Sequence, residues 1–144
     1  MMRTFAHTAY PAVAGLFVAC AVVQVFLAGL GVFDSPTAFV THRGFGYTFG
    51  WLTLVLLVVA LTGRMPRRFV GLSVLLLVLF ALQSVFVALR DDLPALAALH
   101  PVNGFFILGV AVVATRLSWL ARREASEAAA RSDGGVVAVP GEAG

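Results

Sequence analysis

Two histidines, His42 and His100, are the residues of this sequence whose type and position are best suited to chemistry. Each stands at the head of a long apolar run, in the stretches "THRGFGYT" and "LHPVNGFF". Imidazole binds transition metals through a ring nitrogen, and it can also carry a proton near neutral pH. Such a histidine indicates either a ligand site or a buried hydrogen-bonding group, and its surroundings must decide between the two.

Both histidines belong to an internal repeat. Four pairs of residues match at an offset of 58: Asp34 with Asp92, Pro36 with Pro94, His42 with His100, and Gly46 with Gly104. One residue out of that register, Gln24 and Gln83 fall late in the two preceding apolar runs. Each half therefore consists of an apolar helix, a loop with an Asp-x-Pro motif, and a second apolar helix that carries the histidine.

The elements that must position these residues are helices in a membrane. The chain has 144 residues, of which 60% are hydrophobic and 12% charged, and its mean hydropathy is +0.97. A soluble domain of this size cannot bury that much apolar surface, and four runs are long enough to cross a bilayer. We expect an all-α membrane protein, a four-transmembrane-helix up-down-up-down bundle built from two tandem helical hairpins. The expected helices are 12–32, 37–62, 69–89 and 95–121, in a domain of residues 1–122; the remaining residues 123–144 read as a cytoplasmic tail, largely disordered.

Charge predicts the orientation in the membrane. All ten basic residues are arginines, and most of them lie before the first run, between the second and third runs, or after the fourth. By the positive-inside rule, both termini are cytoplasmic and the two loops that carry aspartates face outward. The Ala-, Val-, Leu- and Gly-rich composition is typical of a GC-rich bacterial genome, so the expected location is the bacterial inner membrane. Topology accounts for the arginines, and no nucleic-acid partner is expected.

The repeat predicts that the two histidines face each other. If the second and fourth helices begin near Pro36 and Pro94, each histidine lies about 9 Å along its helix. Those two helices sit diagonally in a simple bundle, where roughly 12–14 Å separates their axes. That span suits a haem iron with a histidine on each side. We therefore expect His42 and His100 to bind the iron of haem b.

The residues around the histidines extend this hypothesis. Gly46 and Gly104, one turn below each histidine, would leave room for a flat macrocycle. Arg43 and Arg90 could meet the haem propionates as charge partners. Three amides lie at a similar depth and fit either hydrogen bonds to the histidine rings or ordinary interhelical hydrogen bonds: Gln24, Gln83 and Asn103.

Each feature also has a purely structural explanation. Asp and Pro commonly begin helices, and Gly46-x-x-x-Gly50 is typical of close helix packing, either in a homodimer or within the bundle. The alternative function is therefore a cofactor-free structural or accessory membrane protein whose partner is unidentified. An enzyme or transporter is less favoured because the sequence has no catalytic constellation and no intramembrane carboxylate. Cys20, the single cysteine, excludes an intramolecular disulfide.

Two family resemblances add to this interpretation. At "HR" (His42-Arg43) and at Gln83 followed by "LHP", the chain resembles one four-helix half of heme A synthase, which implies that both histidines are axial haem ligands. The acidic residue that this family carries one turn before its histidine is Phe39 here, and the paired loop cysteines are absent, so haem-modifying catalysis is not implied. Through "QVFLAGLGVF" and "LHPVNGF", residues 20–115 also resemble an uncharacterised family of small four-helix bacterial membrane proteins with a domain of unknown function.

Overall fold

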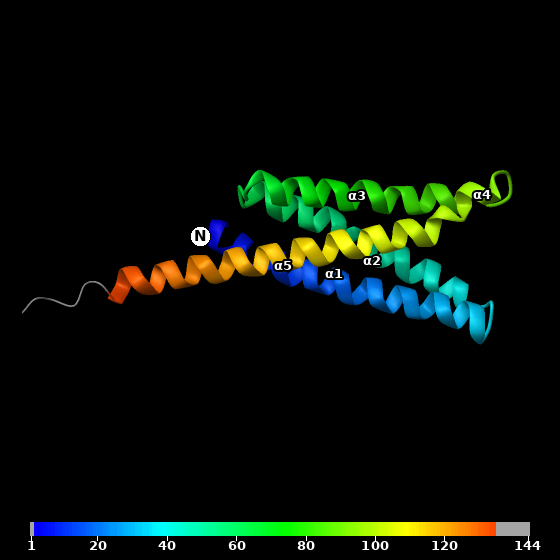
Figure 1. Cartoon of the computed structure of the whole chain (residues 1–144), viewed down its shortest axis with the longest axis horizontal. Coiled ribbons are helices and arrows are strands. Elements are labelled where there is room, and N and C mark those ends of the chain that lie inside the picture. Colours follow the sequence, from blue (N-terminus) through cyan, green and yellow to red (C-terminus); the bar gives the residue numbers. More distant parts are fainter. Residues whose placement is uncertain (1, 135–144) are drawn as a thin grey trace, which may run out of the picture.

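The computed structural model describes residues 2–134 of the chain, and the side chains of residues 5–131. Every regular element in this part is a helix (Figure 1). The elements in chain order are α1 (Met2–Phe33), α2 (Ala38–Thr62), α3 (Arg67–Ala88), the short α4 (Pro94–Ala97) and α5 (Leu99–Gly134). The expected all-helical architecture with four long apolar helices is confirmed, and all four are long and apolar enough to cross a membrane.

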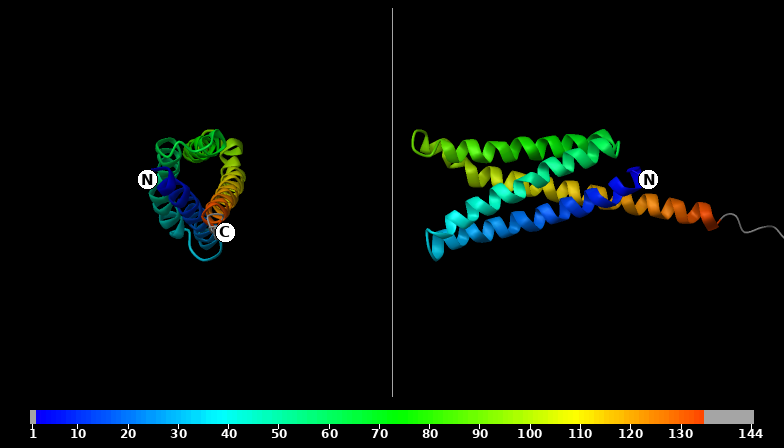
Figure 2. Two further views of the ribbon diagram at one scale, coloured as in Figure 1. Left: turned by 90° about the vertical axis from the view of Figure 1, so that its left-hand side faces the viewer. Right: turned by 180° about the vertical axis from the view of Figure 1, so that it is seen from behind.

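The four long helices pack in a ring. The backbone of α1 approaches α2 and α5, and the backbone of α3 approaches the same two helices. Across the diagonals, the backbones of α1 and α3 stay apart, as do those of α2 and α5, within the described residues. The end-on view in Figure 2 shows this ring. The two helices that carry the histidines are therefore on one diagonal, as the repeat predicts.

The two ends of the bundle differ in their connections. The α1–α2 loop and the α3–α4 loop lie at one end, while the α2–α3 connection and the start of α1 lie at the other (Figure 1). We call the first the loop end and the second the turn end. At the turn end, Arg64 has a positive φ of 49° and Gly63 closes α2 with backbone hydrogen bonds. The repeated Asp-x-Pro motifs both lie at the loop end.

The first helix is longer than expected, and the last continues beyond its predicted membrane-spanning segment. α1 begins at Met2 rather than at residue 12, and Pro11 lies inside it. The apolar side chains of Ala6, Tyr10 and Ala14 are buried at spacings of four residues, so the stripe that faces the core continues through this segment. At the other terminus, α5 runs to Gly134, so residues 123–134 of the predicted tail are helical. Residues 135–144 of that tail lie outside the described residues.

The predicted fourth helix is also interrupted. α4 ends at Ala97 and α5 begins at Leu99, with Ala98 between them. Proline has no backbone N–H, so Pro101 cannot donate the helical hydrogen bond to Ala97. The break therefore lies one turn before the proline, and it places His100 in the first turn of α5.

The turn half of the bundle is tightly packed. Tyr10 of α1 is fully buried, and its hydroxyl donates to the carbonyl oxygen of Phe69 at 3.2 Å and shares a 3.0 Å hydrogen bond with Ser73 Oγ. Nearer the middle, the rings of Phe17, Phe49 and Phe80 contact one another, with centroids 5.2–6.2 Å apart. This aromatic cluster separates the packed turn half from the half that contains the histidines.

Candidate functional site: a histidine pair in an apolar cavity

A cavity of about 730 Å³ occupies the half of the bundle nearer the loop end. All four long helices contribute to its wall. Phe49, Phe80 and Ile107 line it on the side of the packed half. Most of the remaining lining is apolar or glycine: Ala21, Val25, Ala28, Gly29, Val32, Phe39, Gly46, Tyr47, Val87, Pro101, Gly104 and Phe105. The polar and charged lining residues are few: His42, His100, Gln24, Gln83, Ser84, Arg43 and Arg90. The whole lining includes every predicted site residue except Asn103.

His42 and His100 face each other across this cavity. The centroids of their rings are 6.2 Å apart, and the ring planes are inclined at 65°. Both side chains are half-buried, and they come from α2 and α5, the two helices on the diagonal. The structure thus brings together two residues that are 58 positions apart in the sequence.

Each histidine ring is held by the main chain of the neighbouring helix. His42 Nδ1 lies 3.1 Å from the carbonyl oxygen of Gln24, and His100 Nδ1 lies 3.3 Å from that of Gln83. A carbonyl oxygen can only accept, so the neutral ring carries its hydrogen on Nδ1. Nε2 is then the unprotonated nitrogen, and in the described part of the chain it has no hydrogen-bond partner. The result is two basic nitrogens on rings that share one cavity.

The side chain of Gln24 reinforces the first of these contacts. Its Nε2 donates to the carbonyl oxygen of His42 at 2.7 Å, so α1 and α2 are joined in both directions. This bond also assigns the two terminal atoms of the Gln24 amide. The atom next to the His42 carbonyl oxygen must be the nitrogen, because an oxygen there would face another acceptor. Gln24 Oε1 is buried and has no partner among the described residues.

Gln83 makes a different contact in the second half. Its Oε1 accepts a 2.7 Å hydrogen bond from Asn103 Nδ2, which also donates to the carbonyl oxygen of Leu79 at 2.8 Å. Asn103 is buried, with 6% of its surface exposed. The hydrogen bonds of Asn103 therefore join α5 to α3 and do not go to a histidine ring. The equivalent position in the first half is Phe45, which cannot make this bond.

The glycines of the repeat make room for the glutamines. A Cβ atom added at Gly46 would lie 2.8 Å from Gln24 Nε2, and one added at Gly104 would lie 3.5 Å from Gln83 Nε2. Both glycines line the cavity, but the space beside Gly46 already holds an amide group. This differs from the expectation that it is left empty for a flat ring. The second glycine of the GxxxG motif, Gly50, faces the ring of Phe80 on α3. Both glycines of the motif thus serve packing within the chain.

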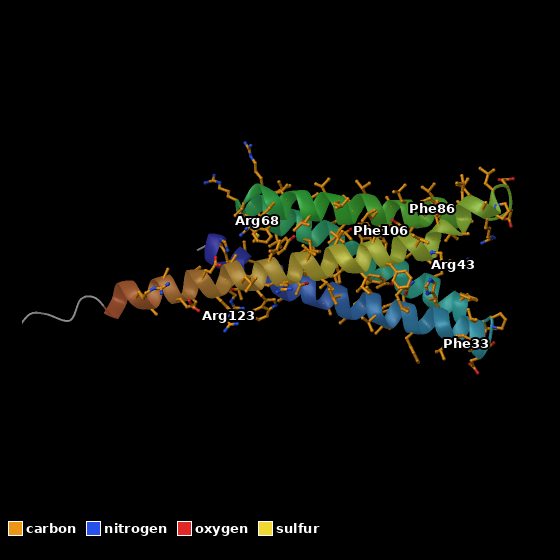
Figure 3. All side chains as sticks on the ribbon, in the orientation of Figure 1. Phe33, Arg43, Arg68, Phe86, Phe106 and Arg123 are labelled. Carbon is orange, nitrogen blue, oxygen red and sulfur yellow. The ribbon has the colours of Figure 1, made fainter. Side chains whose placement is uncertain are left out.

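Two arginines provide the charge of the cavity wall. Arg43 follows His42 in α2, and Arg90 follows the end of α3. Arg90 Nε lies 3.5 Å from an oxygen of Asp91, and both side chains are largely exposed. Arg43 has no acidic partner in the part of the chain that the structure describes, and it lies toward the loop end (Figure 3). An anionic group bound in this part of the cavity could therefore pair with Arg43.

Sequence reasoning missed two aromatic residues of the site. Phe39 packs its ring against His42, with centroids 6.2 Å apart, and also covers Gly31 of α1. Phe80 lines the cavity and belongs to the aromatic cluster. The two lie three residues before His42 and Gln83 respectively, a spacing that places side chains on the same helix face. This three-residue spacing is the feature of the sequence that could have identified both aromatic residues as part of the site.

The comparisons with known proteins give one match. A model described as a family of unknown function (DUF6220) matches residues 24–89. The matched segment begins at Gln24 and contains α2 and α3, with His42 and Gln83, whereas His100 lies beyond it. No curated protein and no solved structure shows significant similarity to the chain. Over residues 24–89 the chain is thus similar to a family whose function is unknown, which is consistent with the resemblance to uncharacterised four-helix proteins; a likeness to heme A synthase is not shown.

Proposed function

We propose that this protein is a four-helix integral membrane protein that binds b-type haem between His42 and His100. The observation that carries the proposal is the histidine pair itself, with ring centroids 6.2 Å apart and each Nδ1 bound to a main-chain carbonyl. An iron–nitrogen bond of about 2 Å and roughly 1.1 Å from ring nitrogen to ring centre, taken on both sides of a metal, sum to about 6 Å. The separation of the two rings suits one iron atom between them.

The set of available donors favours haem over a bare metal ion. Within the described residues, no third His, Cys, Asp or Glu joins the histidines to form a metal-binding group. A structural zinc site needs four protein ligands and a catalytic one needs three. Porphyrin brings four nitrogens of its own and requires only two axial ligands from the protein. The two imidazoles match that requirement.

The cavity offers a suitable environment for a macrocycle. Its volume of about 730 Å³ lies within the range of roughly 300–1,000 Å³ that is usual for ligand pockets, and its wall is mainly apolar. Aromatic residues close it toward the packed half. Arg43 and Arg90 are the charged residues of the cavity wall, and they can pair with propionates.

The protein's own groups indicate what the site would do. Bound haem supplies one-electron redox chemistry. The carbonyl acceptors fix the orientation of both imidazoles and place the donor at Nδ1, which leaves Nε2 available as a ligand. His42 and His100 would together supply the two ligands that the porphyrin does not provide, so that no coordination position would remain for a substrate. This arrangement favours electron transfer or haem handling over catalysis on a bound substrate.

The distribution of charge supports a specific placement in the membrane. The arginines of the turn end lie in the α2–α3 connection, at the start of α3 and beyond the apolar part of α5: Arg64, Arg67, Arg68, Arg122 and Arg123. By the positive-inside rule, that end is cytoplasmic, and the histidine pair lies near the outer face. The chain would then be an up-down-up-down bundle in the bacterial inner membrane, with both termini in the cytoplasm.

One observation favours a cofactor-free structural protein as the second candidate. The hydrogen bonds that hold His42 and His100 also join α1 to α2 and α3 to α5. Polar groups in hydrocarbon stabilise helix association when they satisfy one another. The same contacts can therefore be explained as interhelical hydrogen bonds alone.

A reduced-minus-oxidised visible spectrum distinguishes these two candidates. The protein is purified in detergent from cells supplied with haem, and a second sample is reconstituted with added haem. We expect the sharp absorption bands of a six-coordinate b-type centre, with one haem per chain. A flat spectrum after reconstitution would falsify the haem proposal and leave the structural alternative.

A further inference from the structure

The charge on the cavity wall is confined to one side. Arg43 belongs to α2 and Arg90 follows α3, two neighbouring helices of the ring. The opposite neighbours, α1 and α5, contribute no charged residue to the lining. The cavity is thus built on a repeat, but its two sides are not equivalent.

The helix geometry shows which way Arg43 faces. Gly50 lies directly against Phe80 of α3. Arg43 precedes Gly50 by seven residues, which is close to two helical turns, so both lie on the face of α2 that is turned toward α3. Ser84 and Arg90, from α3 and its end, line the cavity on that side.

The matching position of the second half is Pro101, 58 residues after Arg43. Pro101 lies on the face of α5 that is turned toward α1, because Thr115, close to four turns further on, contacts the position of Gly15 in α1 at 3.9 Å. Apart from Gln24 and His100, the lining from α1 and α5 is apolar or glycine, and it includes Val25, Gly29 and Phe105. Where one half of the repeat has a cation, the other has a rigid apolar ring.

We propose that the cavity binds its ligand in one orientation, with an anionic edge toward α2 and α3 and an apolar edge toward α1 and α5. This inference rests on the proposed function, because haem b carries both carboxylates on one edge of the macrocycle. Arg43 and Arg90 are then the residues that determine orientation and specificity for a ligand with carboxylates. A guanidinium can form paired hydrogen bonds with a carboxylate, and an esterified carboxylate loses that interaction.

The test compares two ligands that differ only in charge: haem b and its dimethyl ester. Both are titrated into the detergent-solubilised protein at one fixed salt concentration, and binding is followed by the visible spectrum. We expect the wild-type protein to bind haem b about tenfold more tightly than the ester, a ratio that corresponds to roughly 1.4 kcal/mol. In the double variant Arg43→Gln/Arg90→Gln, the affinity for haem b should fall to the affinity for the ester.

The controls separate the two proposals. Arg67→Gln changes an arginine at the turn end and should leave the tenfold preference intact. The double variant should bind the ester as tightly as the wild type does, and this result would show that the variant is folded. If wild-type protein binds both ligands equally well, the oriented site is rejected while the haem proposal stands. If it binds neither ligand, both proposals fail.

Discussion

At the level of single residues, main-chain carbonyls rather than charged side chains hold the two histidines. Gln24 and Gln83 each offer a helical carbonyl oxygen to an imidazole, and their side chains then act differently. Gln24 binds back to His42, whereas Gln83 is held by Asn103. The two histidines are therefore similarly oriented but differently supported.

Replacement of either histidine tests the ligand assignment. We expect His42→Ala and His100→Ala each to abolish or sharply weaken haem retention, because each removes one axial nitrogen. The measurement is the haem-to-protein ratio after purification, taken from the visible spectrum. His7→Ala, which changes a histidine near the start of α1, should retain full occupancy. Full occupancy in the double variant His42→Ala/His100→Ala would overturn the assignment.

Alanine substitution of the two glycines of the repeat should have unequal effects. A Cβ at Gly46 would lie 2.8 Å from Gln24 Nε2, so Gly46→Ala should displace the amide and weaken its bond to His42. At Gly104 the distance is an ordinary 3.5 Å, and Gly104→Ala should be tolerated. Thermal unfolding in detergent, with the apoprotein, is the measurement. A larger loss of stability at Gly104 than at Gly46 contradicts this reading of the repeat. The bulkier Gly46→Leu should in addition weaken haem binding.

At the level of elements, helix α2 is fitted to two different neighbours through its glycines. Gly46 admits the Gln24 side chain of α1, and Gly50 admits the Phe80 ring of α3. A small residue at such a position lets two helices approach closely. The GxxxG motif thus accounts for packing inside the bundle and does not require a second copy of the chain.

The Gly50 contact predicts a stability difference that is specific to one interface. Gly50→Val should destabilise the protein by roughly 1–3 kcal/mol, since the new side chain overlaps Phe80. Gly71→Val is the matched control, because nothing lies within 4 Å of a Cβ at that position of α3. Chemical unfolding of both variants in mixed micelles measures the difference. Equal stability of the two variants would show that α2 and α3 do not pack as described.

The sequence predicted the long helices and the histidine pair because both depend on simple periodicities. Apolar runs of membrane length define the helices, and a repeat with a constant offset places His42 and His100 at one depth. The contacts of Gln24 and Gln83 were not predictable in the same way. Whether a glutamine binds through its side chain or its backbone carbonyl depends on how two helices meet. The helix break at Ala98, in contrast, follows from Pro101, which lacks a backbone N–H. The extension of α1 back to Met2 was not predicted, because the expected bounds followed the apolar run that starts at Ala12, whereas the buried stripe begins at Ala6.

At the level of the whole molecule, the two ends of the bundle carry different charges. Arg68 and Arg123 lie toward the turn end, and the loops that carry aspartates are at the other end (Figure 3). This distribution has a direct consequence for orientation if the protein spans a bilayer.

Accessibility of single cysteines tests that orientation. In a Cys20→Ala background, Ser35→Cys and Asp92→Cys lie in the two loops at the loop end, and Arg64→Cys lies in the α2–α3 connection. A membrane-impermeant thiol reagent applied to spheroplasts should label the first two and spare the third until the membrane is permeabilised. Labelling of the α2–α3 connection in sealed spheroplasts reverses the proposed topology.

The length of α5 has a consequence for the dynamics of its last segment. Beyond Arg122 the helix continues for 12 residues to Gly134, about 18 Å, and the described side chains there are exposed to solvent. Initiation is the costly step of helix formation, and the packed part of α5 supplies the nucleus, so this Ala-rich segment needs only to propagate. Its amide hydrogens should then exchange in a gradient, fastest at Gly134 and progressively slower toward the bundle, as a helix that frays from one end.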